Sequence, residues 1–473
     1  MDYEMTVGLE IHCELKTESK LFCGCRNAFG GKPNEYSCEG CGAFPGTLPA
    51  MNKLAVEYIV RAGLALNCKI NKLSRWDRKS YFYPDLPKAW QVSQQEFPVC
   101  GAGLVEYEVG GIKKSARINR IHLEEDAGKL VHEDGVTKSD ANRGGLSLIE
   151  IVTEPDFHSA DEVVAFLDEL KSILKYTGVS DVKMQEGSLR CDVNMSVAPY
   201  GSKTLGVRTE TKNLNSFAAA RRSIEWEYAR QAAAVKSGEK LVQQTRRWDD
   251  AKGEGYAMRS KENAHDYRYF PDPDVLPLVL TDEDIAEFKS RLPELRKSKL
   301  ARYTGELGLP EYDAKILTGD RDVSILFDGA VKLYNNPKKV SNYIMSEVLR
   351  KGKIEGSEDI EIRVSPKQLA GILELVEQGA LSLAASRAVL DKIWGTSEEP
   401  KKATESLGLV QVNDAGEIEA VVKGIIDANP RAAAEYRAGN AKTAAFFVGQ
   451  AMKATQGKCN PKMVGDILER LLK

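Results

Sequence analysis

The sequence predicts an α+β protein in which a mainly antiparallel β-sheet domain precedes an α-helical domain and a small helical tail domain. Within residues 1–294, short segments alternate apolar and polar residues, as half-exposed antiparallel strands do. From about residue 295 onward, apolar residues recur at spacings of three and four, which is typical of amphipathic helices. The length of 473 residues fits about three domains, which we predict at residues 1–294, 295–404 and 405–473.

Composition excludes several classes of protein. The 66 Lys and Arg residues nearly balance the 69 Asp and Glu residues, and the resulting net charge of −3 excludes a polybasic coat for nucleic acid. No run of about 18 apolar residues is present, which excludes a transmembrane helix. Residues 1–4 have the features of neither a signal peptide nor a transit peptide. We therefore expect the protein to act in the cytoplasm.

Four predicted strands carry similar polar side chains on one face. In residues 7–12, for example, Glu10 and His12 point away from the apolar side of the strand. If the four strands share one antiparallel sheet, its solvent-facing side brings together carboxylates and an imidazole, which are suitable ligands for Mg²⁺ or Mn²⁺. Arginine and lysine side chains beside them could bind phosphate. For each strand taken alone, the alternative interpretation is that its polar side chains are simply exposed to solvent and bind nothing. The other strands contribute Arg190, Asp192 and Asn194, then Arg208, Glu210 and Lys212, and finally Glu124 or Glu125, between which alternation cannot choose.

Four of the nine cysteines form two close pairs, Cys23 with Cys25 and Cys38 with Cys41. Four thiolates at such spacing can form a tetrahedral shell around Zn²⁺, and a closed shell of this kind is structural because no position remains for a substrate. Unmetallated thiols and an iron–sulfur cluster are the alternatives.

Residues 79–88 (KSYFYPDLPK) combine aromatic rings, prolines and two lysines. Such a loop can present cations to phosphate and rings to a base, although a rigid aromatic turn would have the same composition. The sequence contains no G-x₄-G-K-[ST] loop, no G-x-G-x-x-G and no H-E-x-x-H, so any use of ATP depends on a less common fold.

The helices are predicted from caps and apolar spacing. Ser159 and Glu162 form a capping-box pattern, an apolar stripe follows, and Gly178 marks the end of this helix. The second part predicts helices at residues 296–307, 322–334, 340–350, 367–378 and 382–394. Residues 423–473 carry nine Lys and Arg against four Asp and Glu, a local excess of five positive charges that suits contact with a nucleic-acid backbone or a solvated basic face.

Taken together, these motifs resemble the B-subunit family (GatB) of the tRNA-dependent amidotransferases. The resemblance covers essentially the whole chain. Residues 89 and 90, Ala-Trp where the family usually has Gly-Tyr, and Gly255, in place of Thr, depart from the pattern. Besides the four cysteines, the matching segments are residues 8–12 (GLEIH), 48–49 with Asn52, 79–88, 121–129 (IHLEEDAGK), 140–143, 148–152 (LIEIV), 190–194 (RCDVN), 209–215 (TETKNLN), 258–262 (MRSKE), 265–271 (HDYRYFP) and 448–453 (VGQAMK).

The resemblance implies a kinase-like catalytic cradle, a helical domain and a tail domain similar to the YqeY family. It further implies that ATP phosphorylates the side-chain carboxylate of the amino acid on Glu-tRNA(Gln), and in many organisms Asp-tRNA(Asn), before ammonia attacks the acyl phosphate. Two partners in a GatCAB complex are also implied. GatA, an amidase, would release the ammonia from glutamine, and GatC would wrap the junction of GatA and GatB.

The metal and catalytic roles carried over from the family fall on Glu10, His12, Glu125, Asp192 and Glu210, as ligands of magnesium, and Glu124 could replace Glu125 in that set. Charge and position, rather than the family, suggest that Lys79, Arg190 and Arg208 contact phosphate.

Without the resemblance, two further functions stay open. One is a zinc-bearing RNA-binding module without catalysis, and the other is a metal-dependent phosphohydrolase. Dependence on ATP separates the amidotransferase from both.

Overall fold

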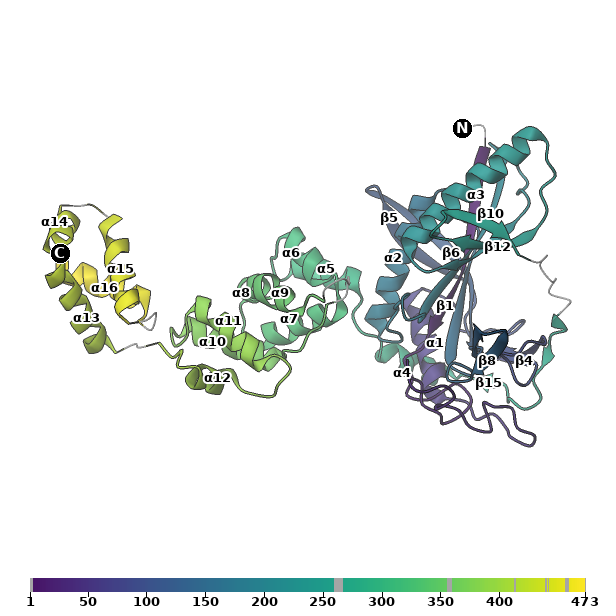
Figure 1. Cartoon of the computed structure of the whole chain (residues 1–473), viewed down its shortest axis with the longest axis horizontal. Helices are drawn as coiled ribbons and strands as arrows, with labels where there is room; N and C mark the ends of the chain where they lie inside the picture. Colours follow the sequence, from purple (N-terminus) through teal and green to yellow (C-terminus); the bar gives the residue numbers. More distant parts are fainter. Residues whose placement is uncertain are drawn as a thin grey trace. The chain divides into compact units, whose positions relative to one another are not determined.

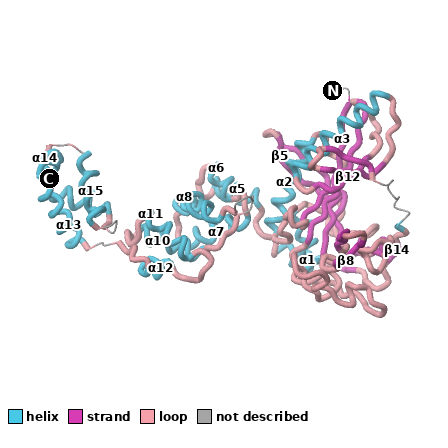
Figure 2. The backbone as a smooth tube through the Cα atoms, in the orientation of Figure 1, coloured by secondary structure: helices cyan, strands magenta, loops and turns pink. Residues whose placement is uncertain are grey.

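The chain is described here by a computed structural model that covers residues 3–258, 267–354, 360–411, 414–438, 440, 442–455 and 459–472 (Figure 1). It divides into two compact units, Met1–Leu295 and Arg296–Lys473. The first unit contains a mainly antiparallel sheet with helices and the second is helical, which confirms the predicted α+β class (Figure 2). The predicted three-domain boundaries stay predictions. Among the described residues, no helix is long and apolar enough to cross a membrane.

The first unit is built on an eight-stranded sheet with the strand order β13-β12-β11-β10-β1-β9-β6-β5. All neighbouring strands are antiparallel except β11 and β12, which are parallel. The strands are β1 (Tyr3–Glu14), β5 (Gly103–Val109), β6 (Ile112–Glu125), β9 (Ser147–Thr153), β10 (Leu189–Pro199), β11 (Thr209–Leu214), β12 (Gln244–Asp249) and β13 (Glu254–Ala257).

Three smaller sheets complete the strands of the first unit. One has the order β14-β3-β4, and the other two pair β15 with β2 and β7 with β8. The strands are β2 (Leu73–Ser74), β3 (Asp77–Ser80), β4 (Trp90–Ser93), β7 (Lys129–Glu133), β8 (Val136–Asp140), β14 (Phe270–Pro271) and β15 (Leu278–Val279). The described part of the residue 265–271 motif begins at Tyr267, whereas residues 259–262 of the preceding motif, and residues 265 and 266, lie outside the described residues.

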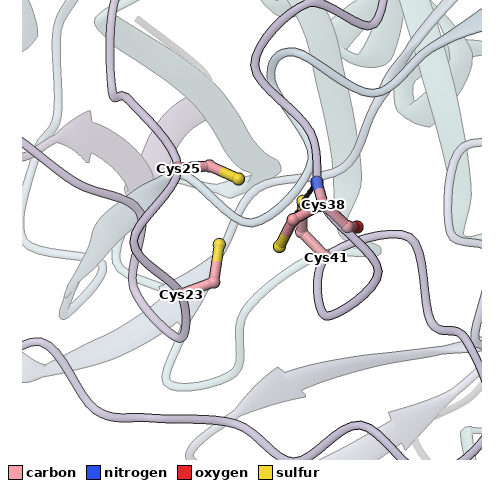
Figure 3. Close-up of side chains that lie close together, drawn as sticks. All are labelled: Cys23, Cys25, Cys38 and Cys41. Carbon is pink, nitrogen blue, oxygen red and sulfur yellow. Dashed lines mark hydrogen bonds between the residues drawn. The ribbon is translucent and has the colours of Figure 1, made fainter.

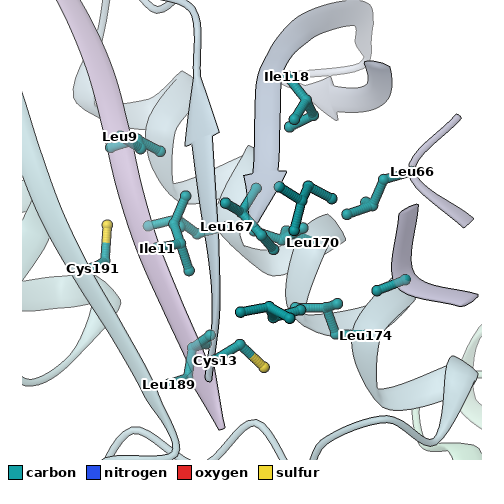
Figure 4. Close-up of a cluster of buried hydrophobic side chains, with 14 of the residues drawn as sticks. Leu9, Ile11, Cys13, Leu66, Ile118, Leu167, Leu170, Leu174, Leu189 and Cys191 are labelled. Atoms are coloured by element: carbon teal, nitrogen blue, oxygen red, sulfur yellow. The ribbon is translucent and has the colours of Figure 1, made fainter. Parts of the chain in front are cut away.

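One face of the large sheet is buried against helices of the same unit. Leu9, Ile11 and Cys13 alternate along β1 and join a single apolar cluster with Leu167 and Leu170 of α2 (Figure 4). Because neighbouring residues of a strand point to opposite faces, the even-numbered residues of β1 remain for the other face. The helices of this unit are α1 (Lys53–Ala65), α2 (Ala160–Thr177), α3 (Phe217–Ser237) and α4 (Asp282–Ser290).

The predicted helix at residues 160–177 is confirmed with both of its end signals, although the capping differs in one bond. The Ser159 side chain accepts a hydrogen bond from the Glu162 amide, and Gly178 ends the helix in the left-handed conformation with φ of 73°. The Glu162 carboxylate accepts from the His158 amide at 3.0 Å, so it reaches one residue further back than the capping box predicts.

The second unit contains two separate apolar clusters. Residues from Tyr303 to Ala403 form one and residues from Ile418 to Leu472 form the other. Each of the five predicted helices has a counterpart in this unit, whereas α6 and α12 were not predicted. The helices are α5 (Arg296–Gly305), α6 (Glu311–Leu317), α7 (Arg321–Leu333), α8 (Pro337–Tyr343), the π-helix η2 (Ile344–Val348), α9 (Leu349–Gly352), α10 (Pro366–Glu377), α11 (Leu383–Ile393), α12 (Pro400–Ser406), α13 (Ala415–Ala428), α14 (Pro430–Arg437), α15 (Lys442–Ala454) and α16 (Pro461–Leu472).

Candidate catalytic site and metal centres

The polar face of the large sheet is organised in rows that follow the strand register. In one row, Arg190, His12, Glu150 and His122 stand side by side on β10, β1, β9 and β6. One step along the strands, Asp192 pairs with Glu10 and Glu10 pairs with Val152. The alternation seen in single strands therefore does bring their polar side chains to one face.

The first acidic cluster consists of His12, Glu124 and Glu150. The Nε2 atom of His12 lies 3.6 Å from Glu124 Oε1 and 3.4 Å from Glu150 Oε2. One ligand atom from each of the three side chains lies within 4.8 Å of the others. Burial opposes the charge of His12, but the hydrogen bond and charge of Glu150, together with the charges of Glu124 and Asp192, outweigh burial and raise its pKa above the ordinary value. One imidazole and two carboxylates in this arrangement are suitable ligands for a divalent cation.

His122 supports the same carboxylates from the buried side. Its Nε2 atom lies 3.4 Å from Glu124 Oε2 and 3.4 Å from Glu150 Oε2. Ser93 donates a further hydrogen bond of 3.0 Å to Glu124 Oε2. Burial lowers the pKa of His122, but the two carboxylates raise it more, to about 9. These contacts fix the orientation of both carboxylates, as outer partners of metal ligands commonly do.

The second acidic cluster consists of Glu10, Asp192 and Glu210, which also present ligand atoms within 4.8 Å of one another. Lys212 Nζ contacts Asp192 and lies 3.2 Å from Glu210 Oε1, so one positive charge already faces this cluster. Asn194 Nδ2 donates to Glu10 Oε1 at 3.0 Å. Thr245 donates to Glu210 Oε2 at 2.8 Å. Each of the three carboxylates is thus held by at least one partner of the site.

Both acidic clusters border a common cavity of about 570 Å³, which Glu10, His12, Glu124, Glu150 and Glu210 line. Its positively charged lining includes Lys79 of β3, Arg120 of β6, Arg208 and Lys212. Burial opposes the charge of Lys79, but the electrostatic effects of its neighbours, of which that of Glu124 is the largest, together outweigh burial and raise its pKa. The rings of Tyr267 and Tyr269 form another part of the wall. The cavity therefore combines carboxylates, cations and aromatic rings, as a site for metal-bound phosphates and a nucleotide does.

Two residues predicted for this site point elsewhere. The Glu125 carboxylate contacts Lys88 Nζ and accepts from the Val92 amide at 2.8 Å. The Arg190 guanidinium donates to Asp126 Oδ1 at 3.0 Å. Neither residue lines the common cavity among the described residues, whereas Lys79 and Arg208 do.

Glu150 is the member of the first cluster that the sequence prediction did not include. It appeared only within the family motif at residues 148–152. The signal that could have found it is the alternation of that segment, in which Leu148, Glu150 and Val152 share one face. Glu150 is the only ionisable residue of β9, Ser147–Thr153.

The four cysteines of residues 23–41 face one another (Figure 3). Their ligand atoms lie within 4.8 Å of one another, and the Sγ atoms of Cys38 and Cys41 are 4.0 Å apart. The Cys38 amide donates to Cys41 Sγ at 3.2 Å, and Lys20 Nζ lies 3.7 Å from the same sulfur. A hydrogen bond from Cys23, helped by the charge of Lys20 against the effect of burial, lowers the pKa of Cys41 to about 4. This donor set fits a tetrahedral zinc ion.

Family comparisons cover most of the chain. Residues 5–286 match the family of GatB/GatE catalytic domains, and residues 325–472 match the GatB domain family called Yqey. The first match contains both acidic clusters and all four cysteines of the candidate metal centres.

Curated relatives align along their full length. The chain is 49% identical over 474 residues to the B subunit of the aspartyl/glutamyl-tRNA(Asn/Gln) amidotransferase of Thermoanaerobacter sp. (strain X514), with 100% of both chains covered. It is 48% identical over 472 residues to the protein of the same name from Lachnoclostridium phytofermentans, with 99% of both chains covered. A relative of that name from Caldicellulosiruptor saccharolyticus is 49% identical over 478 residues, covering 100% of this chain and 99% of the relative.

Proposed function

This chain belongs to the GatB family of amidotransferase B subunits, and from that membership and its acidic cavity we propose that it amidates an amino acid esterified to tRNA. The substrate would be Glu-tRNA(Gln), Asp-tRNA(Asn) or both, and ATP would activate the side-chain carboxylate. The single observation that carries this proposal is the cavity in which two acidic clusters lie beside Lys79 and Arg208.

The proposed reaction has two steps. A carboxylate oxygen of the amino acid attacks the γ-phosphorus of ATP, the bond to the bridging oxygen breaks, and ADP leaves. Ammonia then attacks the acyl carbon, inorganic phosphate leaves, and the nitrogen loses a proton to give the amide. Phosphorylation is needed because oxide is a very poor leaving group, and phosphoryl transfer requires positioning and charge neutralisation more than covalent help from the protein.

The side chains of the cavity fit this task. His12, Glu124 and Glu150 would hold one Mg²⁺ ion, and Glu10, Asp192 and Glu210 would hold a second. Bound magnesium would neutralise charge on the phosphates of ATP. His122 keeps the two carboxylates of the first cluster in place. Lys79 and Arg208 are the side chains that we propose for contact with phosphate, because both line the cavity.

The cysteine cluster has a separate, structural role in this proposal. Cys23, Cys25, Cys38 and Cys41 would bind one Zn²⁺ ion with all four coordination positions occupied by sulfur. Fully buried Lys20 would compensate part of the negative charge of four thiolates, because its Nζ atom faces Cys41.

We propose that the protein works as part of a complex. The amidase GatA would supply ammonia from glutamine, GatC would bind at the junction of GatA and this chain, and the reaction would take place in the cytoplasm. The excess of five positive charges in residues 423–473, nine basic against four acidic, supports contact of the tail with the tRNA backbone.

Amidation by the chain co-purified with GatA and GatC tests this function. Ammonium chloride replaces glutamine as nitrogen donor, Mg²⁺ and Glu-tRNA(Gln) are supplied, and the amino acid on the tRNA is identified with and without ATP. We expect Gln-tRNA(Gln) only with ATP. Binding of tRNA without any ATP-dependent product would instead favour the RNA-binding module.

A substitution of Asp192 assigns the activation step to the acidic site. We expect Asp192→Ala to abolish ammonium-dependent amidation, because the second cluster loses one of its three carboxylates. Release of ammonia from glutamine should continue, since that step belongs to GatA. Unchanged amidation would remove Asp192 from the site. Asp161→Ala, at an exposed position in the first turn of α2, is the control.

A further inference from the structure

Lys212 of β11 already occupies the second acidic cluster. Its Nζ atom contacts Asp192 and lies 3.2 Å from Glu210 Oε1, so one ammonium group bridges two of the three carboxylates that could hold a metal ion. A divalent cation would need oxygen atoms of the same side chains. The ammonium group and a metal ion therefore compete for this cluster, and they repel each other because both are positive.

The backbone of β11 is shaped so that Lys212 reaches this cluster. Two residues of β11, Lys212 and Asn213, stand opposite the single residue Asp192 of β10, because the pairing register shifts at this point. Asn213 has a positive φ of 70°, and its Nδ2 atom donates to the Trp248 carbonyl oxygen at 2.9 Å. An extra residue of this kind is a β-bulge, which redirects a side chain and interrupts regular pairing. The contact of Lys212 with Asp192 is therefore built into the sheet.

The first acidic cluster has no such resident cation. The ion-pair partners of Glu124 and Glu150 are the imidazoles of His12 and His122. Within the part of the chain that the structure describes, no Lys or Arg lies within ion-pair distance of either carboxylate. His12 is itself one of the three possible ligands. The two clusters therefore differ, because the first is open to a divalent cation and the second is balanced by Lys212.

Phosphate would change this balance. Lys212 lines the acidic cavity and its side chain is 41% exposed, so its flexible four-carbon stem can turn from the carboxylates towards an anion in that space. The proposed reaction brings such an anion, because ATP places its phosphate groups at the clusters. Once Lys212 contacts phosphate, the three carboxylates are available to a divalent cation.

We propose that Lys212 is the resting counter-ion of the second cluster, and that a divalent cation replaces it there only when a phosphate chain is bound in the cavity. The protein then holds one divalent cation in the absence of ATP and two in its presence. This inference rests on the proposed function, because that function supplies the phosphate. It adds an order of cation binding, which the acidic residues alone do not determine.

Electron paramagnetic resonance of Mn²⁺ bound to the complex with GatA and GatC tests this inference. Glu10 and His12 lie two residues apart on β1, so ions in the two clusters would be spaced by roughly 7 Å and would be magnetically coupled. We expect the wild type without nucleotide to show one uncoupled Mn²⁺ ion. ATP, in the absence of tRNA, should produce the coupled pair. Inorganic tripolyphosphate should have the same effect, because the inference requires phosphate and no base.

Lys212→Met is the main variant, since it removes the ammonium group and keeps an apolar stem. It should show the coupled pair without any phosphate, and its Kd for the second Mn²⁺ ion should be lower than that of the wild type by about tenfold or more. Lys212→Arg keeps the charge and should behave as the wild type does. Lys16→Met is the matched control, because Lys16 pairs with Asp181 at 2.7 Å and does not line the cavity. It should change neither the number of bound ions nor their coupling.

A second variant leaves Lys212 in place and alters the bulge. Alanine disfavours a positive φ, so Asn213→Ala should relax the bulge and release Lys212 from Asp192. It should therefore also admit the second Mn²⁺ ion without phosphate. The first Mn²⁺ ion reports in every variant whether the sheet is intact, because His12 and Glu150 lie on the neighbouring strands β1 and β9.

Two results would overturn the inference. A coupled pair in the wild type without phosphate would show that Lys212 does not exclude the second ion. A single uncoupled ion in both Lys212→Met and Asn213→Ala would show that the ammonium group is not what keeps the second ion out. A wild-type complex that binds neither Mn²⁺ nor ATP would be a separate result, because it would refute the proposed function itself.

Discussion

Glu124 and Glu125 are adjacent in β6, and their carboxylates lie in different surroundings. Glu124 faces His12 and His122 across the polar side of the sheet, whereas Glu125 contacts Lys88 and the Val92 amide. The alternation of side chains along a strand produces this division, and the same alternation places His122 on the side of Glu124.

A matched pair of substitutions distinguishes the two glutamates. Glu124→Gln should weaken Mn²⁺ binding by about 10- to 100-fold, because a carboxylate ligand becomes a neutral amide of the same shape. Glu125→Gln should leave the Kd for Mn²⁺ within about twofold, since Glu125 lies outside the cluster. Titration of the purified chain, followed by electron paramagnetic resonance of free Mn²⁺, measures both. If Glu125→Gln weakened Mn²⁺ binding more than Glu124→Gln, Glu125 rather than Glu124 would be the metal ligand.

Glu14 gives the chain a dependence of stability on pH that is independent of the acidic clusters. Burial raises the pKa of Glu14 to about 7, against the opposing effect of Arg143, which donates to it at 2.6 Å. The folded state therefore holds this proton more tightly than the unfolded state, so the contribution of Glu14 to stability is full below about pH 4.5 and is lost as the pH rises towards 7.

Glu14→Gln removes this titration and keeps an acceptor for Arg143. Relative to this variant, the wild type should lose up to about 3 kcal/mol of unfolding free energy between pH 4.5 and 7. Urea unfolding at several pH values, followed by tryptophan fluorescence, measures the difference. Glu18→Gln, at an exposed position nearby, is the control. A constant difference between wild type and Glu14→Gln across this range would contradict the prediction.

At the scale of elements, the local pattern predicted which residues share a face but not which strands are neighbours. Alternation placed Glu10 and His12 on the polar side of β1. Glu150 joins them because β9 pairs between β1 and β6, and pairing between distant segments leaves no mark in local periodicity. Whether Glu124 or Glu125 faces the polar side of the sheet likewise depended on how β6 pairs with β9.

The end of one predicted strand shows a second limit of local pattern. Residues 207–212 alternate as a strand does, yet β11 is Thr209–Leu214. Just before it, Gly206 lies so close to β10 that a Cβ atom would stand 2.1 Å from the Val197 carbonyl oxygen. Arg208 lies outside the strand at an exposed position, and it lines the acidic cavity.

The segment that contains the four cysteines has no regular secondary structure that could stabilise it. Residues 23–47 form turns and contain no helix or strand, so a metal ion would supply the cross-link that a hydrophobic core supplies elsewhere. We expect one Zn²⁺ per chain, and its removal by a chelator should increase amide hydrogen exchange in residues 23–44 while the protected core of β1 stays unchanged.

Cysteine variants provide the controls for that measurement. Cys41→Ser should reduce bound zinc and reproduce the increase in exchange without a chelator. Cys68→Ser, at a buried cysteine outside the cluster, should keep the zinc. Equal amide hydrogen exchange of residues 23–44 with and without the metal would show that these turns are stable without it.

At the scale of the whole molecule, the apolar clusters determine where the chain can be cut. Leu409 packs with the cluster that runs from Tyr303 to Ala403, whereas Ile418 begins the last cluster. A deletion that starts at residue 405, the predicted boundary, would remove Leu409 from the cluster that it stabilises. A deletion of residues 414–473 removes the last cluster whole and leaves the preceding one complete.

This deletion tests the role of the basic tail in binding tRNA. We expect the KM for Glu-tRNA(Gln) to rise at least about fivefold and its dependence on salt to become shallower, because fewer counterions are released when fewer cations contact phosphate. In the full-length chain, Lys462→Glu and Arg431→Glu together should shift KM in the same direction, since both side chains are exposed, and Lys462→Arg should have no effect. The Kd for ATP and the rate at saturating tRNA should stay near those of the wild type, because the acidic cavity belongs to the first unit. An unchanged KM with an unchanged salt dependence would leave tRNA binding to the remaining parts of the complex and would refute a role for the tail.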